Sequence, residues 1–314
     1  MEIIRGLHNL KKYTGSVVTI GNFDGVHIGH HHIIDHLVKQ SKLLGLPSVL
    51  ISFSPTPQSF FGREQATLSN FKQKHQLLEQ LGLDFHLIIK FDQAFSNMSA
   101  DDFIQTILIN KLKMKFCLIG DDFRFGSGRT GDFKLLQSSA LKANFEVENT
   151  QSILCDSCRA SSSSIRDLLA NGKLESATKM LGREFSIAGK VIHGRQLGRT
   201  IDFPTINIPI KRNISPVLGI FAVQVDIIGQ RFNGVCNIGK RPTVNGENIL
   251  LEVFLFDFDQ VVYGELANVT FKQRIRDEKK FDSFEALKAQ IILDTQSAKT
   301  YFNQQASNSI LGPP

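Results

Sequence analysis

Two histidines stand three residues apart in the segment 21–30, which has the sequence GNFDGVHIGH. The apolar run 16–20 before it predicts a buried strand, and apolar residues recur at helical spacing after His30. The segment is therefore expected between the end of a strand and the start of a helix, where free backbone N–H groups attract phosphate. His27 and His30 could there donate hydrogen bonds to phosphate oxygens and stabilise charge on a transferring group. The pattern predicts a nucleotide site.

A metal site is the alternative interpretation of this region. Five histidines lie close together in the sequence: His27, His30, His31, His32 and His36. His32 and His36 have the i, i+4 spacing of a zinc site, but Ile33 stands where the H-E-x-x-H pattern has its Glu. The nucleotide interpretation is therefore preferred.

Two other segments resemble phosphate loops without fitting them. Residues 126–131 (GSGRTG) match G-x-G-x-x-G, but they do not directly follow a strand, and a dinucleotide fold would place them after its first strand. A glycine loop over a ligand is the favoured interpretation, and a surface turn is the alternative. Residues 234–241 (GVCNIGKR) end in Arg241 where a P-loop has Ser or Thr, which argues against a Walker-type ATPase.

The first half of the chain alternates strands with helices. Apolar runs predict strands at 16–20, 47–53, 85–91 and 116–120. Helical spacing predicts helices from 30 to a stop at Gly45, over 72–81 and over 100–112. Such alternation implies crossover connections and a parallel sheet, with ligands beyond the carboxyl ends of its strands.

The second half contains short strand-like runs punctuated by Gly, Pro or Asn, which predict an antiparallel barrel. These runs are 186–192, 203–208, 220–228, 230–238, 249–258 and 267–275. A closing helix is expected with Asp282 as N-cap and an apolar face of Phe284, Leu287 and Ile291, followed by a frayed tail at 306–314. A further helix over 164–181 ends near Gly182, so the predicted domains are 1–182 and 183–314.

Bulk composition limits the function classes. The 314 residues are 42% hydrophobic and carry a formal net charge of +6, which suits binding of anions such as nucleotides. No dense Lys/Arg block points to nucleic acid, no apolar run is long enough for a membrane span, and no signal peptide is recognised. A cytoplasmic location is expected. Cys155 and Cys158 form a C-x-x-C without a second pair, which disfavours a zinc or redox role, and Cys117 and Cys236 are expected in the core.

Several motifs occur in one order and carry a family resemblance. GNFDGVHIGH resembles the H-x-G-H motif of nucleotidylyltransferases. Five segments follow it: GDDFRFGSGRTGD (120–132), SSSSIR (161–166), GRQLGRTIDFPTIN (194–207), GVCNIGKRPT (234–243) and IRDEKKFDS (275–283). Together, over nearly the whole chain, they are similar to the prokaryotic bifunctional riboflavin kinase/FMN adenylyltransferase family.

The resemblance implies a fold and an activity. It implies a nucleotidylyltransferase-type α/β domain with a Rossmann-like parallel sheet, followed by an antiparallel β-barrel riboflavin kinase domain. The kinase would phosphorylate riboflavin to FMN with ATP and Mg²⁺, and the other domain would adenylylate FMN to FAD and release pyrophosphate. Riboflavin, FMN and ATP are the expected partners, with no nucleic acid and no membrane.

The resemblance also assigns roles to residues. For adenylyl transfer, His27 and His30 would stabilise phosphates. The nucleotide would lie against Gly21, Asn22, Phe23, Asp24 and Gly29, its pyrophosphate against Ser162, Ser163 and Arg166, and FMN against Asp122, Phe123 and Arg124. For the kinase, Glu252 is the candidate base, and Thr205 and Asn207 would bind Mg²⁺ and ATP. Gly194, Gly198 and Arg199 would wrap the phosphates, and Arg276 would close over the flavin.

The chain departs from the family pattern at several positions. Thr56 stands where the family usually has the His of P-H-P, and Ser163 replaces a Thr. In the kinase half, Asp202, Ile206 and Phe254 replace Gly, Ala and His. The changes leave two alternatives open: a kinase whose first domain is impaired or uses another substrate, and a flavin-binding protein without turnover. Nucleic-acid binding, given a pI near 9.1, is a further alternative.

Overall fold

The structure is a computed structural model that describes residues 1–10, 14–150, 154–155, 158–194, 203–210, 214–243 and 246–310. The chain forms two compact units, each described by itself below. Unit 1 comprises Met1–Gln65 and Phe71–Ser162, and unit 2 comprises Ala66–Asn70 and Ser163–Pro314.

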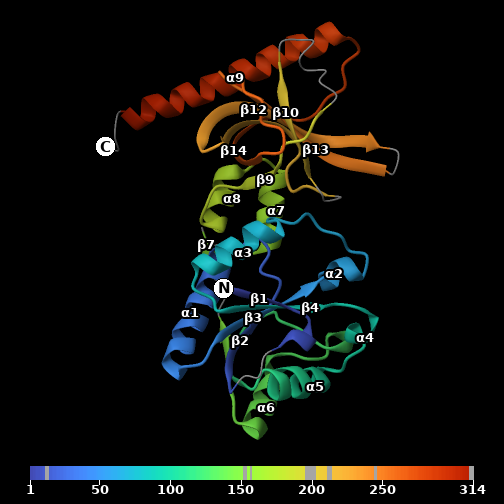
Figure 1. Cartoon of the computed structure of the whole chain (residues 1–314), viewed down its shortest axis with the longest axis vertical. Helices are drawn as coiled ribbons and strands as arrows, with labels where there is room; N and C mark the ends of the chain where they lie inside the picture. The colour runs from blue at the N-terminus through green and yellow to red at the C-terminus, as the bar shows by residue number, and fades with distance from the viewer. Residues whose placement is uncertain are drawn as a thin grey trace. The chain divides into compact units, whose positions relative to one another are not determined.

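Unit 1 is built on a parallel six-stranded sheet (Figure 1). Its strands are β1 (Glu2–Arg5), β2 (Ser16–Ile20), β3 (Ser48–Ser54), β4 (Phe85–Lys90), β5 (Met114–Gly120) and β6 (Glu146–Thr150). The spatial order is β1-β4-β3-β2-β5-β6, and every neighbouring pair is parallel. The chain moves outward from β2 through β3 and β4, then returns to place β5 on the other side of β2. The carboxyl ends of β2 and β5 therefore mark the switch point where sheets of this type bind ligands.

Helices cover both faces of this sheet. Val17 and Val18 are fully buried and belong to different core clusters, because successive side chains of a strand point to opposite faces. Helices α1 (Ile28–Leu44) and α3 (Phe71–Gln80) contribute to the Val17 cluster. The π-helix η2 (Phe103–Lys111) and α6 (Phe133–Ala143) contribute to the Val18 cluster. Burial on both faces explains why these strands are continuous apolar runs.

The sequence predictions for unit 1 are largely confirmed. All four predicted strands are present, α1 ends at Gly45 in the left-handed conformation (φ 63°), and α3 matches the predicted helix. The predicted helix 100–112 begins as α5 (Ala100–Asp102) and continues as η2. Strands β1 and β6 and the 11-residue helix α6 were not predicted, nor were the short helices η1 (Leu7–Asn9), α2 (Pro57–Phe60), α4 (Gln93–Ser96) and η3 (Ser127–Arg129).

Unit 2 contains a six-stranded antiparallel barrel in the order β10-β13-β12-β11-β14-β9. Its strands are β9 (Ser186–Lys190), β10 (Thr205–Ile210), β11 (Gly219–Ile227), β12 (Gln230–Thr243), β13 (Gly246–Leu255) and β14 (Leu266–Arg276). The backbone N–H of Ile192 donates to the carbonyl oxygen of Asn207 at 2.8 Å, which joins the chain after β9 to β10 and closes the barrel. All six predicted strands are confirmed.

The helices of unit 2 correct three expectations. The continuous helix over 164–181 is wrong: α7 (Ser162–Ala170) and α8 (Leu174–Leu181) are separated at Gly172, whose φ of 69° is incompatible with a helix. Asp282 does not cap α9 (Phe284–Ile310), because the hydroxyl of Ser283 accepts the N–H of Ala286 at 3.1 Å. The part of the expected frayed tail that the structure describes, 306–310, is helical, since no Gly or Pro interrupts it, and 311–314 lie outside the described residues.

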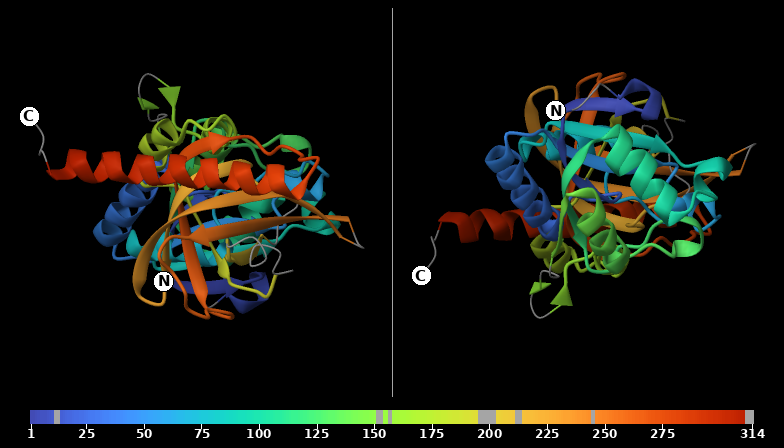
Figure 2. Two further views of the ribbon diagram at one scale, coloured as in Figure 1. Left: turned by 90° about the horizontal axis from the view of Figure 1, so that it is seen from above. Right: turned by 90° about the horizontal axis from the view of Figure 1, so that it is seen from below.

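Helix α9 packs along the outer face of the barrel (Figure 2). Its fully buried Ala298 lies in a cluster with Ile220, Val235 and Phe256. Within the described ranges, no helix is long and apolar enough to span a bilayer.

The expected core positions of Cys117 and Cys236 are confirmed. Cys117 and Cys236 are buried and free, and burial raises the pKa of the Cys117 thiol to about 12, so it stays protonated and unreactive. The backbones of Cys155 and Cys158 face each other across a two-stranded hairpin, β7 (Leu154–Cys155) and β8 (Cys158–Arg159).

Candidate functional sites

The loop after β2 brings the histidine motif to the switch point of unit 1. Phe23, Gly25 and Val26 have positive φ values of 49°, 81° and 40°. Two non-glycine residues in this region are uncommon and cost free energy, which indicates that the surrounding structure holds the turn in place. The turn delivers His27 as the residue that caps the N-terminus of α1.

His27 and His30 lie against each other as a pair. Their ring centroids are 3.6 Å apart with an interplanar angle of 22°, and they form a reciprocal capping box. The backbone N–H of His27 donates to Nδ1 of His30 at 3.3 Å, which leaves Nε2 of His30 as the proton-bearing nitrogen. A Cβ at Gly29 would come within 3.2 Å of two atoms of the His27 ring. The glycine of the H-x-G-H motif therefore makes room for the first histidine.

Two side chains support the same loop: Lys74, which was not predicted as a site residue, and Ser162, which was. Nζ of Lys74, from α3, donates to the carbonyl oxygen of Asn22 at 3.1 Å. Burial lowers the pKa of Lys74, while the negative charge of Asp24 opposes that effect. The hydroxyl of Ser162 donates to the carbonyl oxygen of Asp24 at 2.9 Å. Lys74 was missed because a lysine on a helix usually indicates a solvated face.

A cavity of about 690 Å³ opens beside this loop and lies wholly within unit 1. Gly21 and Asn22 line it together with the predicted flavin residues Asp122, Phe123 and Arg124. The size is in the range of small-molecule and cofactor sites. The structure thus brings two predicted groups of residues, far apart in the sequence, to one cavity.

The cavity wall is mainly aromatic and carries positive charge. Its seven phenylalanines are Phe53, Phe61, Phe91, Phe95, Phe103, Phe123 and Phe125, and its three arginines are Arg63, Arg124 and Arg129. Aromatic walls stack on flat ring systems, and guanidinium groups pair with phosphate. Of these residues the sequence analysis named only Phe123 and Arg124. The segment FSPTPQSFFGR (53–63), at the end of β3, contains three of these residues, Phe53, Phe61 and Arg63, and was the sequence signal that could have predicted them.

The G-x-G-x-x-G segment contributes to the same wall. Gly126, Gly128 and Arg129 line the cavity, while Phe125 and Gly131 pair their backbones at the base of the loop (N–O 3.1 and 2.9 Å). A Cβ at Gly126 would clash with the backbone of Ala100 at 2.6 Å. This segment is a cavity-lining loop with tight turns.

Thr56 occupies a structural position next to the cavity. Its hydroxyl accepts the N–H of Ser59 at 3.2 Å and caps α2, whose residues Pro57 and Gln58 line the cavity. Thr56, which stands where the family usually has histidine, therefore caps a short helix at the cavity edge.

Residues 163–166 of the serine–arginine motif belong to unit 2, including the predicted site residues Ser163 and Arg166. Ser163 lies in the first turn of α7, and Nε of Arg166 donates to the carbonyl oxygen of Ala66. This hydrogen bond joins Ala66 to α7. The pyrophosphate role of both residues stays a prediction.

The histidines that raised the metal alternative have other partners or surroundings. Nε2 of His36 lies 2.9 Å from a carboxylate oxygen of Glu148, and His32 lines a separate polar cavity with Asp35 and Lys39, which pair at 2.7 Å. Among the described residues, no group of three or more His, Cys, Asp and Glu side chains is placed to hold a metal ion.

In unit 2, strand register brings the predicted kinase residues together. Asn207 of β10 pairs directly with Glu252 of β13, and Thr205 pairs with Phe254. Cross-strand partners point to the same face, so the amide and the carboxylate lie side by side. Nδ2 of Asn207 donates to the carbonyl oxygen of Thr205 at 3.3 Å, which leaves Oδ1 for a ligand.

A second cavity, of about 390 Å³, adjoins these strands. Gly194, Thr205 and Asn207 line it, together with the segment 258–263. A Cβ at Gly194 would clash with the Asn207 amide, which explains the glycine. Tyr263 stacks on His193 with centroids 3.6 Å apart at its edge. Gly198 and Arg199, like Asp202, lie outside the described residues, and their roles stay predictions.

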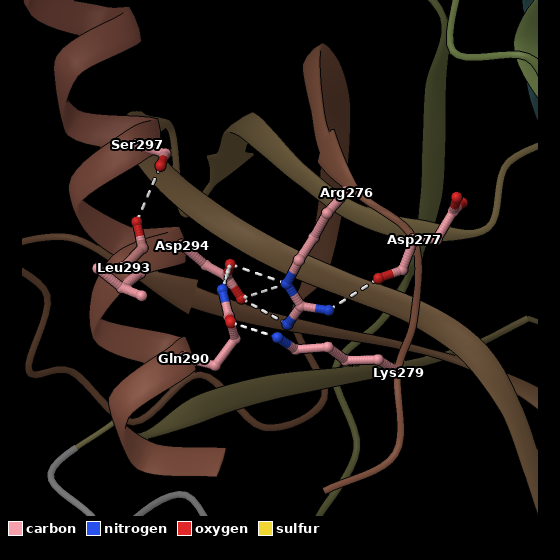
Figure 3. Close-up of polar contacts among 7 residues, drawn as sticks. All are labelled: Arg276, Asp277, Lys279, Gln290, Leu293, Asp294 and Ser297. Atoms are coloured by element: carbon pink, nitrogen blue, oxygen red, sulfur yellow. Dashed lines mark hydrogen bonds and ion pairs between the residues drawn. The ribbon is translucent and has the colours of Figure 1, made fainter. Parts of the chain in front are cut away.

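Arg276 is engaged by helix α9 (Figure 3). Its guanidinium forms a bidentate ion pair with Asp294, with Nη2–Oδ2 at 2.6 Å and Nε–Oδ1 at 2.9 Å. Asp294 also accepts from Gln290, which in turn accepts from Lys279. The predicted flavin contact of Arg276 stays a prediction; in this structure Arg276 ties the end of β14 to α9.

Comparison with known proteins gives two family matches. Residues 10–164 match a family model described as FAD synthetase, and residues 181–302 match one described as riboflavin kinase. A protein of Haemophilus influenzae named bifunctional riboflavin kinase/FMN adenylyltransferase is 46% identical over 96% of this chain and 100% of its own length. A protein of Escherichia coli K12 with the same name is 42% identical over 96% and 98%.

A solved structure extends the likeness to the fold. A chain titled macrolide-efflux protein from Streptococcus pneumoniae has a TM-score of 0.80 and 29% identity, covering 94% of this chain and 97% of that one.

Proposed function

The chain belongs to the bifunctional riboflavin kinase/FMN adenylyltransferase family, and we propose that unit 2 makes FMN from riboflavin while unit 1 converts FMN to FAD. It is a transferase that uses ATP for both reactions. The direct pairing of Asn207 with Glu252 in the barrel is the observation that best supports the kinase site. The aromatic, arginine-bearing cavity beside the histidine loop best supports the flavin site.

In the kinase reaction, Glu252 acts as the base. Its carboxylate takes the proton of the riboflavin 5′-hydroxyl as the hydroxyl oxygen bonds to the γ-phosphorus of ATP. The bond from that phosphorus to the β,γ-bridging oxygen breaks, and ADP leaves with the electron pair. The proton then passes from Glu252 to solvent.

Thr205 and Asn207 supply the oxygen donors of a magnesium site. A hydroxyl and an amide oxygen from i, i+2 positions of one strand fit Mg²⁺, which is usually held by few protein oxygens plus substrate phosphates. When bound, Mg²⁺ neutralises phosphate charge during transfer. Gly194 keeps the adjacent space open for those phosphates.

In the adenylyl transfer, His27 and His30 stabilise charge on the phosphates of ATP. An FMN phosphate oxygen attacks the α-phosphorus, the α,β-bridging bond breaks, and pyrophosphate leaves. Nε2–H of His30 donates to an oxygen that gains charge in this step. The flavin ring lies among the phenylalanines of the 690 Å³ cavity, and Asp122, Phe123 and Arg124 contact FMN. Ser162, Ser163 and Arg166 hold the pyrophosphate.

Domain limits of 1–182 and 183–314 are proposed for the two activities, which assigns α7 and α8 to the adenylyltransferase domain although they belong to the compact unit 2. The cytoplasm stays the predicted compartment. The test is product analysis of the full chain with riboflavin, ATP and MgCl₂. Riboflavin, FMN and FAD are separated by chromatography and detected by fluorescence. Formation of FMN followed by FAD supports the assignment. FMN without FAD would contradict the role of unit 1, and unchanged riboflavin would contradict the role of unit 2.

A further inference from the structure

One guanidinium in the barrel bridges two carboxylates. Nη2 of Arg241 lies 2.7 Å from Oε2 of Glu252, and Nη1 lies 3.1 Å from Oε1 of Glu278. Nη1 also donates to the carbonyl oxygen of Lys240 at 3.2 Å. All three charged side chains are about two-thirds buried, which reduces solvent screening of their attraction.

Strand geometry explains how Arg241 reaches Glu252. Glu252 pairs with Asn237 on β12, and Gly239 and Arg241 follow at alternate positions on the same face. Because Gly239 has no side chain, the Glu278 carboxylate can lie over it; a Cβ there would clash with that carboxylate. The glycine therefore makes room for the bridge.

The segment that carries Glu278 is anchored by the contacts of the residues next to it. Glu278 lies in the charged segment 277–280 directly after β14. Arg276 pairs with Asp294 and Lys279 with Gln290 (Figure 3), and Asp277 pairs with Arg274. Two of these partners lie on α9. Glu278 thus presents its carboxylate to Arg241 from an anchored segment.

Arg241 shares its guanidinium between two carboxylates, and this arrangement has a chemical consequence. A single carboxylate often pairs with two nitrogens of an arginine. Here Glu278 takes Nη1, so Glu252 meets Arg241 through Oε2 and Nη2 alone. Oε1 of Glu252 is thereby left to accept a proton. Burial tends to lower the pKa of Arg241, but hydrogen bonding and attraction from Glu252 and Glu278 outweigh it and raise the pKa, so Arg241 stays charged.

We propose that Arg241 is a positioning residue for phosphoryl transfer, holding Oε2 of Glu252 so that Oε1 faces the attacking hydroxyl, with Glu278 fixing Arg241. The proposal rests on the proposed role of Glu252 as base. Arg241 does not touch substrate in this scheme and acts only through Glu252.

The test uses the full chain and steady-state formation of FMN from riboflavin with ATP and MgCl₂. Arg241→Gln should lower kcat by about 10- to 100-fold, the scale of misplaced catalytic groups, with little change in KM for riboflavin or ATP. Arg241→Lys should recover part of the loss, because Lys keeps the charge but lacks the planar fork. Glu278→Gln should give a smaller loss of kcat.

Two controls separate positioning from folding. Arg231→Gln removes another arginine–carboxylate pair, between exposed Arg231 on β12 and Asp226 on β11 (2.7 Å), and should leave kcat unchanged. In the Glu252→Gln background, Arg241→Gln should add no further loss, because residues that act as one unit are non-additive.

The outcomes are distinguishable. If Glu252→Gln keeps full activity, the proposed base is wrong, and the inference fails with it. If Glu252→Gln is impaired but Arg241→Gln matches Arg231→Gln, only the inference is overturned. An equal loss from Arg241→Gln in both backgrounds would also overturn it, because it would show a structural role.

Discussion

The two units position their chemical groups by different means. In unit 1 the candidate groups lie on a loop beyond the strand ends, and the loop needs positive-φ residues, Lys74 and Ser162 to hold its shape. In unit 2 Asn207 and Glu252 lie within paired strands, so the sheet register itself sets their separation. We infer that the positions of the chemical groups in unit 1 depend on residues around the site. In unit 2 those positions depend on the site residues themselves and on their cross-strand neighbours.

The largest expected effect comes from a substitution that should impair only the activity of unit 2. Glu252→Gln should lower the rate of FMN formation by about 10³-fold, because general-base catalysis contributes on that scale. Adenylylation of added FMN should be unchanged. Asp226→Asn, which changes a partly buried carboxylate of the same sheet that pairs with exposed Arg231, is the matched control. Equal loss of both activities would contradict the assignment of separate sites.

The reciprocal experiment uses a substitution that should impair only the activity of unit 1. His30→Ala should lower FAD formation from FMN by about 10²-fold, since it removes one donor to a charged phosphate oxygen. The kinase rate should be unchanged. His32→Gln, on the same helix but lining a different cavity, is the control. Normal FAD formation in His30→Ala would refute its role.

Stability against acid should also differ between the units. His86 is fully buried, its Nε2 lies 2.7 Å from Ser52 Oγ, and burial together with the charge of Lys74 lowers its pKa to about 3. The unfolded chain, with a histidine pKa near 6.5, binds this proton more readily, so stability falls as pH drops from about 6.5 toward 3.

Between pH 7 and pH 5 the loss from His86 should be about 2 kcal/mol. Urea unfolding followed by circular dichroism at both pH values measures it. His86→Gln should show a smaller loss than the wild type, whereas exposed His8→Gln should not differ from the wild type. Equal pH sensitivity of all three proteins would show that His86 is not responsible.

The smallest effect concerns the cavity edge in unit 1. Thr56→Ala removes the cap of α2 and should cost about 1 kcal/mol locally. The KM for FMN should rise modestly, because Pro57 and Gln58 line the cavity, while the kinase KM for riboflavin should not change. Thr56→Ser keeps the hydroxyl and serves as the control. Identical behaviour of Ala and Ser would rule out the capping role.

Sequence periodicity predicted most of the fold. Buried strands such as β2 and β13 were predicted because continuous apolar runs are rare outside a core. The edge strands β1 and β6 were missed because each is only four or five residues long and has few apolar residues, two in EIIR and one in EVENT. Local signals also misplaced the start of α9, where Asp282 and Ser283 are both good caps and only backbone geometry selected Ser283.

The order of motifs identified the family and named His27, His30, Asn207 and Glu252, because these residue types carry their chemistry wherever the fold places them. Tertiary structure alone decided the rest. Phe53, Phe91 and Phe95 form one wall only because crossover connections bring separate strand ends together. Arg241 meets both Glu252 and Glu278 only because strand register and an anchored segment converge on it. Sequence fixes what each side chain can do, while long-range packing fixes which side chains meet.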